Sequence, residues 1–175
     1  MNTRVLKPRH GPTILVRPLR NGDVDAVLAV FHRLGEQSRR KRFNGPKARL
    51  TEDELFQLAV VDSTHHVLIG YVEGDPDPVA IARLVRDGRS AEIAFEVAND
   101  YQQRGIGSAL TEELLADARA AGITEVTALV SSDNPAALAL LRRTLDALEI
   151  SLEGPELWIR AAMPTGSGRS SLNGR

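Results

Sequence analysis

Apolar positions recur along this chain with two periods, one typical of strands and the other of helices. Residues 13–17 are rich in β-branched side chains and Pro18 ends the run, which predicts a first strand. Behind Asp23, the apolar residues of 24–34 follow i, i+3, i+4, i+7 spacing, which predicts an amphipathic helix capped by that aspartate. Residues 51–54 read Thr-Glu-Asp-Glu, a capping box that predicts the start of a second helix.

Three strand-like runs occupy the middle of the chain, at residues 65–73, 79–85 and 91–98. The segments that separate them, 74–78 and 87–90, carry the Gly, Asp, Pro and Ser residues that favour turns. Because these connections are short, the three runs are expected to form an antiparallel meander.

Helix and strand patterns alternate in the remainder of the chain. Apolar residues at helical spacing predict a helix over 109–121, with Ile106 on the same face as Leu110 and Gly122 as its C-cap position. The other expected elements are a strand over 125–130, a helix from Asn134 and Pro135 to about residue 145, and strands over 147–152 and 156–162.

These elements predict one α/β domain over residues 13–162, in the order β-α-α-β-β-β-α-β-α-β-β. Residues 1–12 are expected to form an N-terminal extension. Residues 163–175 are rich in Gly and Ser and are expected to be a disordered tail.

Composition narrows the functional class. A net charge of −1 argues against a nucleic-acid partner, and no apolar run approaches the roughly 20 residues of a membrane helix. With no cysteine, the chain has no disulfide, thiolate metal site or cysteine nucleophile. His65 and His66 are adjacent on an expected strand and point to opposite faces, so no metal site is expected there. The absence of an apolar leader predicts a cytoplasmic location.

The segment 98–108, Ala-Asn-Asp-Tyr-Gln-Gln-Arg-Gly-Ile-Gly-Ser, joins an expected strand to an expected helix. Its glycines allow backbone N–H groups to converge at the positive end of the helix dipole, where a phosphate binds well. A Walker A loop is excluded because Ser108 follows the second glycine, and a dinucleotide fingerprint because Leu110 replaces its third glycine. A plain glycine-containing loop is the alternative.

The spacing Gln-x-x-Gly-x-Gly over residues 102–107 resembles the pyrophosphate loop of the GNAT superfamily of N-acetyltransferases. The resemblance implies a mixed, mostly antiparallel seven-stranded sheet flanked by about four helices, with acetyl-CoA as co-substrate and no metal. It also implies that the strand before the loop splays from its neighbour after Val97, which exposes backbone groups for the pantetheine arm. The coenzyme-binding residues implied are Phe95, Val97, Gln102, Gln103, Arg104, Gly105, Ile106, Gly107, Ser108 and Asn134. Arg104 is equally well explained as a solvated loop residue, and Asn134 as a helix N-cap.

Amine acetylation needs a base, because freeing the lone pair of an alkyl ammonium with a pKa of about 10.4 costs roughly 4 kcal/mol at neutral pH. Glu92 and Glu96 are the candidates, and strand alternation places both on one face. The run Ala91-Glu92-Ile93 resembles the general-base strand of histone acetyltransferases and of bacterial Pat-type protein lysine acetyltransferases. This resemblance implies that Glu92 takes the amine proton through water and that the acceptor is a protein lysine. Glu96 is the second candidate, as a base or a partner of substrate charge.

One family feature is missing. Many members place a general-acid tyrosine in the helix after the fifth strand, but the matching position is Leu141. The two tyrosines of the chain are Tyr71 and Tyr101. Two alternatives to a protein lysine acetyltransferase are therefore a small-molecule amine acetyltransferase and a non-catalytic acyl-CoA sensor. The expected assembly is a monomer or a homodimer. The basic run 39–42 could recognise an acidic substrate or the coenzyme phosphates, or be a solvated face.

Overall fold

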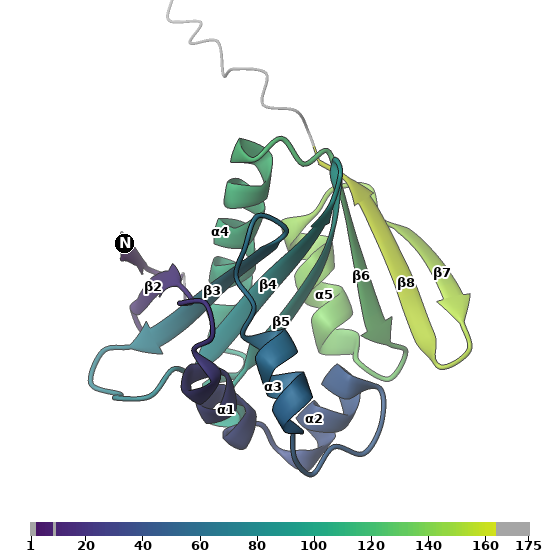
Figure 1. Ribbon diagram of the computed structural model, residues 1–175. Helices are drawn as coiled ribbons and strands as arrows, with labels where there is room; N and C mark the ends of the chain where they lie inside the picture. The colour runs from purple at the N-terminus through teal and green to yellow at the C-terminus, as the bar shows by residue number, and fades with distance from the viewer. Residues whose placement is uncertain (1–2, 9, 164–175) are drawn as a thin grey trace, which may run out of the picture.

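A single mixed sheet forms the centre of the molecule (Figure 1). The computed structural model describes residues 3–8 and 10–163. Within these residues the sheet has eight strands in the order β1-β2-β3-β4-β5-β6-β8-β7. The strands are β1 (Arg4–Leu6), β2 (Ile14–Pro18), β3 (His65–Val72), β4 (Ala80–Asp87), β5 (Ser90–Val97), β6 (Glu125–Ser131), β7 (Glu149–Glu153) and β8 (Glu156–Ala162).

Every pair of neighbouring strands is antiparallel except β5 and β6, which are parallel. The predicted meander is confirmed, since β3, β4 and β5 pair consecutively. The parallel pair follows from the long connection through α4 (Ile106–Ala120). The mixed α/β class and the mostly antiparallel sheet are therefore as predicted.

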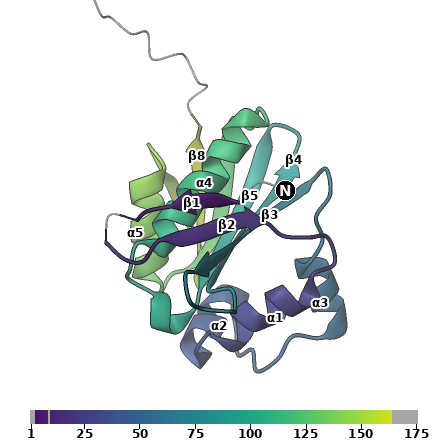
Figure 2. The ribbon, with the colours of Figure 1, turned by 90° about the vertical axis from the view of Figure 1, so that its left-hand side faces the viewer.

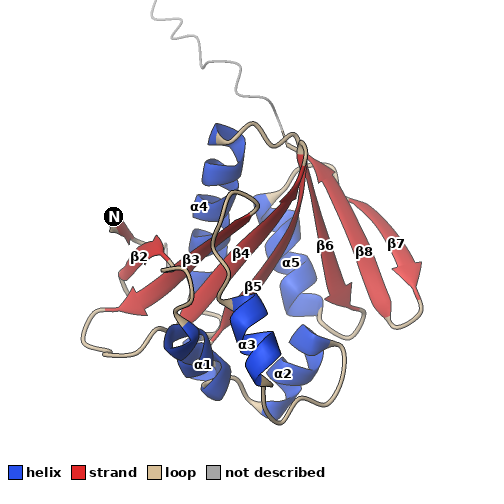
Figure 3. Cartoon of the chain, viewed as in Figure 1, coloured by secondary structure: helices blue, strands red, loops and turns tan. Residues whose placement is uncertain are grey.

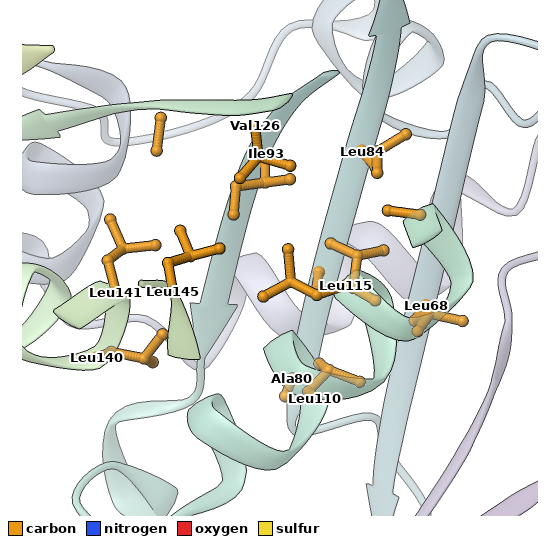
Figure 4. Packing of buried hydrophobic residues seen from close by; sticks show 14 of the residues in the cluster. Leu68, Ala80, Leu84, Ile93, Leu110, Leu115, Val126, Leu140, Leu141 and Leu145 are labelled. Atoms are coloured by element: carbon orange, nitrogen blue, oxygen red, sulfur yellow. The ribbon is translucent and has the colours of Figure 1, made fainter. Parts of the chain in front are cut away.

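Helices cover both faces of the sheet (Figure 3). Helix α4 and α5 (Pro135–Thr144) pack on one face over a large core that includes Leu110, Leu115 and Leu141 (Figure 4). The other face carries α1 (Val24–His32), α2 (Glu36–Phe43) and α3 (Glu52–Leu58) over a second core around Phe31. We call the face with α1, α2 and α3 the open face, because helices cover only part of it.

One strand, one α-helix and a short 3-10 helix over Asn99–Tyr101 were absent from the sequence prediction of seven strands and about four helices. Strand β1 lies in the expected N-terminal extension, where it pairs with β2 beside α4 and Arg4 forms ion pairs with Glu113 and Asp117 (Figure 2). Helix α2 occupies the basic segment and buries none of its residues, so it has no apolar periodicity to reveal it. Its first turn is fixed instead by Asn99, whose Oδ1 accepts a hydrogen bond from the Gly35 N–H.

The expected disordered tail lies outside the described residues from 164 onward. Its first residue, Met163, is buried, and its N–H donates to the Thr124 carbonyl.

Candidate functional site

The sheet opens between its two parallel strands. Strands β5 and β6 pair only from Ser90 to Glu92 against Glu125 to Thr127, and they are no longer paired from Ile93 onward. The sequence prediction placed this splay after Val97, whereas the pairing ends five residues earlier, at Glu92. The gap thus runs along half the length of β5 and exposes more of its edge than expected.

Backbone groups of β5 face this gap. The Ala98 N–H donates to the Val79 carbonyl, on the β4 side of the strand. Because successive residues of a strand direct their N–H and C=O groups to opposite edges, those of Phe95 and Val97 face β6. The Val97 carbonyl already accepts a hydrogen bond from Gln102 Nε2 at 3.0 Å. Within residues 3–8 and 10–163 the other backbone groups of Phe95 and Val97 have no hydrogen-bond partner, so they can pair with an extended ligand.

The loop after β5 ends at the first turn of α4. Gln103 and Gly105 have φ values of +59° and +75°, and this left-handed geometry turns the loop into the helix. Gly105 is the N-cap and offers no side chain to the first turn. Among the described residues, none accepts a hydrogen bond from the backbone N–H groups of residues 103–108. These donors lie at the positive end of the helix dipole, which suits an anion.

Both glycines of the loop are closely surrounded. A Cβ added to Gly107 would lie 2.9 Å from Leu140 Cδ1 and 3.4 Å from Val97 Cγ2. At Gly105, a Cβ would lie 3.0 Å from the His10 carbonyl oxygen. The segment before β2 therefore packs directly on the loop, and the absence of a side chain lets three parts of the chain meet there.

A charged network fixes the loop from outside. The Tyr101 hydroxyl donates to Asp75 Oδ2 at 2.9 Å, and Arg33 Nη2 donates to the same oxygen at 2.8 Å. The Arg33 and Arg104 guanidiniums lie 5.2 Å and 5.3 Å from the centroid of the Tyr101 ring. The Arg33 hydrogen bond lowers the pKa of Asp75 from 3.8 to about 2. This network ties the loop to α1 and to the β3–β4 connection.

A cleft of about 1300 Å³ extends from this loop through the gap to the open face. Most of the predicted site residues line it, and so do five basic residues. Those predicted are Phe95, Glu96, Val97, Gln102, Gln103, Gly105, Gly107, Ser108 and Asn134; the five basic ones are Lys7, His10, Lys41, Arg42 and Arg143. Lys41 and Arg42 belong to the basic run 39–42 that the sequence analysis had singled out, whereas Lys7, His10 and Arg143 gave no signal.

Three predicted residues do not line the cleft. The Ile106 side chain is 1% exposed and belongs to the core, Arg104 lies beside Tyr101, and Glu92 lies farther along β5. Asn134 lines the cleft and also caps α5, because its Oδ1 accepts a hydrogen bond from the Ala137 N–H at 3.2 Å. Both interpretations of Asn134 are therefore compatible with its position.

The two candidate carboxylates share a face but differ in their surroundings. Glu96 Oε1 accepts a hydrogen bond from Arg42 Nε at 2.8 Å, and its side chain is 4% exposed. Arg83 is also buried near Glu96, and burial lowers its pKa to about 10 although the Glu96 charge opposes this shift. Glu92 is exposed, and no ion-pair partner for it lies within residues 3–8 and 10–163. Glu96 is thus part of a buried charge cluster, while Glu92 is open to water.

Helix α5 presents apolar residues to the cleft. Leu141, the position matched to the family tyrosine, is fully buried in the core, and Leu140 lines the cleft instead. Tyr71 is hydrogen-bonded to Arg17, and Tyr101 is bound to Asp75. Tyr101 lines the cleft, but neither phenol lies on α5, where the resemblance predicts the family tyrosine.

No cluster of three or more His, Cys, Asp or Glu side chains suited to a metal ion occurs in the described part of the chain. His65 contacts Asp62 whereas His66 contacts Asp117, so the two histidines do point to separate partners. None of the helices described is long and apolar enough to span a bilayer.

Comparisons with known proteins find relatives of similar sequence. A family model described as "Acetyltransferase (GNAT) family" matches residues 28–146. The chain is 35% identical over 144 residues to Acetyltransferase Pat of Mycolicibacterium smegmatis, a match that covers 80% of this chain and 42% of that protein. This chain therefore spans less than half the length of that curated relative.

Solved structures are similar as well. The GNAT domain of S. lividans PAT superposes with a TM-score of 0.83 at 24% identity, over 92% of this chain and 97% of that one, which shows a shared fold. A cAMP-binding acyltransferase from Mycobacterium smegmatis gives a TM-score of 0.67 at 25% identity, over 95% of this chain and 49% of that one.

Proposed function

This chain belongs to the GNAT family of acetyltransferases, and on that premise we propose that it transfers the acetyl group of acetyl-CoA directly to an amine, specifically a protein lysine. The observation that carries the proposal is the combination of the open β5–β6 gap with the uncapped glycine loop at its end. A gap edged by free backbone groups fits an extended pantetheine arm, and the loop fits a pyrophosphate.

The residues present fit this coenzyme. The N–H groups of residues 103–108 would hold the pyrophosphate, with Gly105 and Gly107 allowing close approach. The backbone edges of Phe95 and Val97 would pair with the pantetheine amides, and Asn134 would contact its thiol end. When bound, acetyl-CoA supplies an acetyl group activated as a thioester.

The transfer forms a bond between the amine nitrogen and the acetyl carbon and breaks the carbon–sulfur bond. The acceptor ammonium must therefore lose one proton before it attacks and a second as the amide forms, and the departing sulfur must gain one. We assign the removal of the first proton to Glu92, acting through a water molecule. Its exposure supports this role, because an accessible carboxylate can pass protons on to bulk water.

Glu96 is less suited to that task because its carboxylate is held by Arg42. We assign it a positioning role that keeps α2 beside the gap. Since α5 offers no tyrosine, the proton that the departing sulfur gains would come from solvent or from the nitrogen of the acceptor ammonium group.

The test compares Glu92→Gln and wild type by calorimetry with acetyl-CoA and by a thiol-release assay with protein, peptide and small-amine acceptors. We expect kcat to fall at least about 100-fold with the Kd for acetyl-CoA unchanged. Undiminished turnover in Glu92→Gln would remove Glu92 from the mechanism.

The same measurements separate the alternatives. Thiol release with small amines alone would favour a small-molecule acetyltransferase. Saturable acetyl-CoA binding with no thiol release from any acceptor would favour a non-catalytic acyl-CoA sensor, which the missing tyrosine on α5 motivates. No binding of acetyl-CoA would overturn the proposed function altogether.

A further inference from the structure

Beside the cleft, the open face of the sheet continues from β6 across β8 and β7, and none of the described helices lies over β8 or β7, whereas α2 contacts β6 (Figures 1 and 3). Its side chains are fixed by strand register. Leu129 on β6 lies opposite Trp158 on β8, which lies opposite Ser151 on β7. Leu129 also lines the cleft, so this surface is continuous with it.

The centre of this surface is apolar. Leu129 is 37% exposed at the middle of a paired strand. Trp158, its cross-strand neighbour, is half-buried. Tryptophan and leucine side by side on a flat strand surface provide an anchoring contact for a polypeptide.

Carboxylates surround this centre, and we call the whole surface the acidic sheet face. Strand pairing places them on the same side as Trp158: Glu92 opposite Thr127, Glu149 opposite Arg160, and Glu153 opposite Glu156. Arg160 is the cation among them, and it lies 3.8 Å from Glu125. Negative charge is therefore in excess here, although the chain as a whole carries only −1.

The opposite rim of the cleft has the reverse charge. Helix α2 contributes Lys41 and Arg42 to the lining and carries Arg39 and Arg40 next to them. An extended cationic segment at the cleft is therefore repelled on the α2 side and attracted on the β7–β8 side.

We propose that the acidic sheet face docks the polypeptide around the acceptor lysine and selects segments in which further Lys or Arg residues flank that lysine. The inference rests on the proposed function, since it names the acceptor class of the same site. The flanking cations would lie against Glu149, Glu153 and Glu156, and an apolar or cationic neighbour would contact Trp158. Glu92 would then be the carboxylate of this face nearest the reacting amine.

Binding can be measured without catalysis. Trp158 is the only tryptophan of the chain, so its fluorescence reports occupation of this face. The protein saturated with acetyl-CoA is titrated with peptides that carry one acetylation-resistant lysine analogue, a trimethyl-lysine, in basic, neutral or acidic flanks. We expect a saturable change with basic flanks, weakened by salt, and none with acidic flanks.

Selectivity is then tested with two double variants of equal charge change. Glu149→Gln with Glu153→Gln removes charge from the acidic sheet face, whereas Glu73→Gln with Asp77→Asn removes it from exposed positions of the β3–β4 connection. For the first variant, the ratio of kcat/KM for a basic peptide to kcat/KM for a small amine should fall about fivefold. The control should keep the wild-type ratio.

The outcomes distinguish this inference from the proposed function. If the protein acetylates lysine peptides but treats basic and acidic flanks alike, or if both double variants behave alike, the inference fails and the proposed function stands. If no acceptor is acetylated, the proposed function fails. In that case, no change in Trp158 fluorescence with basic peptides would also refute the docking surface. A change in Trp158 fluorescence that weakens with salt would support the acidic sheet face as a binding surface.

Discussion

Glu92 and Glu96 differ by four positions on one strand face, yet only Glu96 is buried. This contrast fits the chemical role proposed for Glu92 and the positioning role proposed for Glu96. Glu96 balances Arg42 and lies near the buried Arg83, whose Nε and Nη2 atoms have no hydrogen-bond partner within the described residues. Glu92 contacts water.

Glu96→Gln should lower the free energy of unfolding by about 2 kcal/mol, because it leaves the Arg42 and Arg83 guanidiniums without their carboxylate. Urea unfolding measures this loss. The matched control is Glu92→Gln, which removes an exposed carboxylate from the same strand and should change stability by less than about 0.5 kcal/mol. Equal losses in the two variants would contradict the assignment.

Leu141→Tyr should destabilise the fold by about 2 kcal/mol, because the added ring and hydroxyl enter a filled core where the hydroxyl finds no partner. It should not raise kcat. Thermal unfolding and thiol-release rates check both points, with Leu141→Met as the control of similar volume. A faster enzyme with Leu141→Tyr would show that this position reaches the cleft.

At the scale of elements, the loop between β5 and α4 combines the geometry of two glycines with a network of side chains. Gly105 is left-handed and closely packed, whereas Gly122, after the same helix, is left-handed with φ +78° and has open space around it. The two positions thus share backbone strain but not surroundings.

Gly105→Ala and Gly122→Ala should each cost about 1 kcal/mol of stability from the strained backbone. Only Gly105→Ala should weaken acetyl-CoA binding, by at least about tenfold, because its Cβ displaces the loop from the His10 carbonyl. Unfolding curves and calorimetry separate the two effects. Equal loss of affinity in both variants would argue against the loop as the coenzyme site.

The Asp75 network predicts a dependence on pH. Asp75 has a pKa of about 2 in the folded protein and an ordinary value of 3.8, so the folded state binds fewer protons between these values. Its contribution to stability is complete above about pH 4 and is lost as the pH falls through 2. Urea midpoints from pH 5 to 2 should therefore converge for wild type and Asp75→Asn. A constant difference between them would exclude this contribution.

Elements whose apolar residues recur with a clear helical or strand period could be predicted from the sequence, and elements without such a period were missed. The meander, α4 and the glycine loop follow from apolar spacing and turn residues. Helix α2 is polar on every side, and β1 has only three residues, so neither produces a pattern. Sequence alternation likewise placed Glu92 and Glu96 on one face, but it could not show that Arg42, distant in sequence, neutralises one of them.

At the scale of the whole molecule, the proposed coenzyme site draws on segments that are far apart in the sequence. Residues before β2, the end of β5, the start of α4 and helix α5 all line one cleft. A ligand in the cleft would therefore contact several elements at once and stabilise the folded state.

Acetyl-CoA at 100 times its Kd should raise the free energy of unfolding by about 2.7 kcal/mol, with a rise in Tm of about 5–10 °C. Differential scanning calorimetry over a series of concentrations measures this. Gly105→Ala at the same concentrations should show a smaller rise, and Gly122→Ala the wild-type rise. A Tm independent of acetyl-CoA would contradict the proposed coenzyme.

The alternation along β5 has a consequence for how such a protein can diversify. Its odd-numbered residues face the gap through backbone atoms, which every amino acid supplies, while Glu92, Ala94 and Glu96 project side chains to the open face. Substitutions on the open face can therefore change which acceptor is recognised, while the proposed backbone contacts to acetyl-CoA are kept. Because one strand serves the acetyl donor through its backbone and the acceptor through its side chains, the two can evolve independently. This favours the evolution of new acceptor specificities on one scaffold.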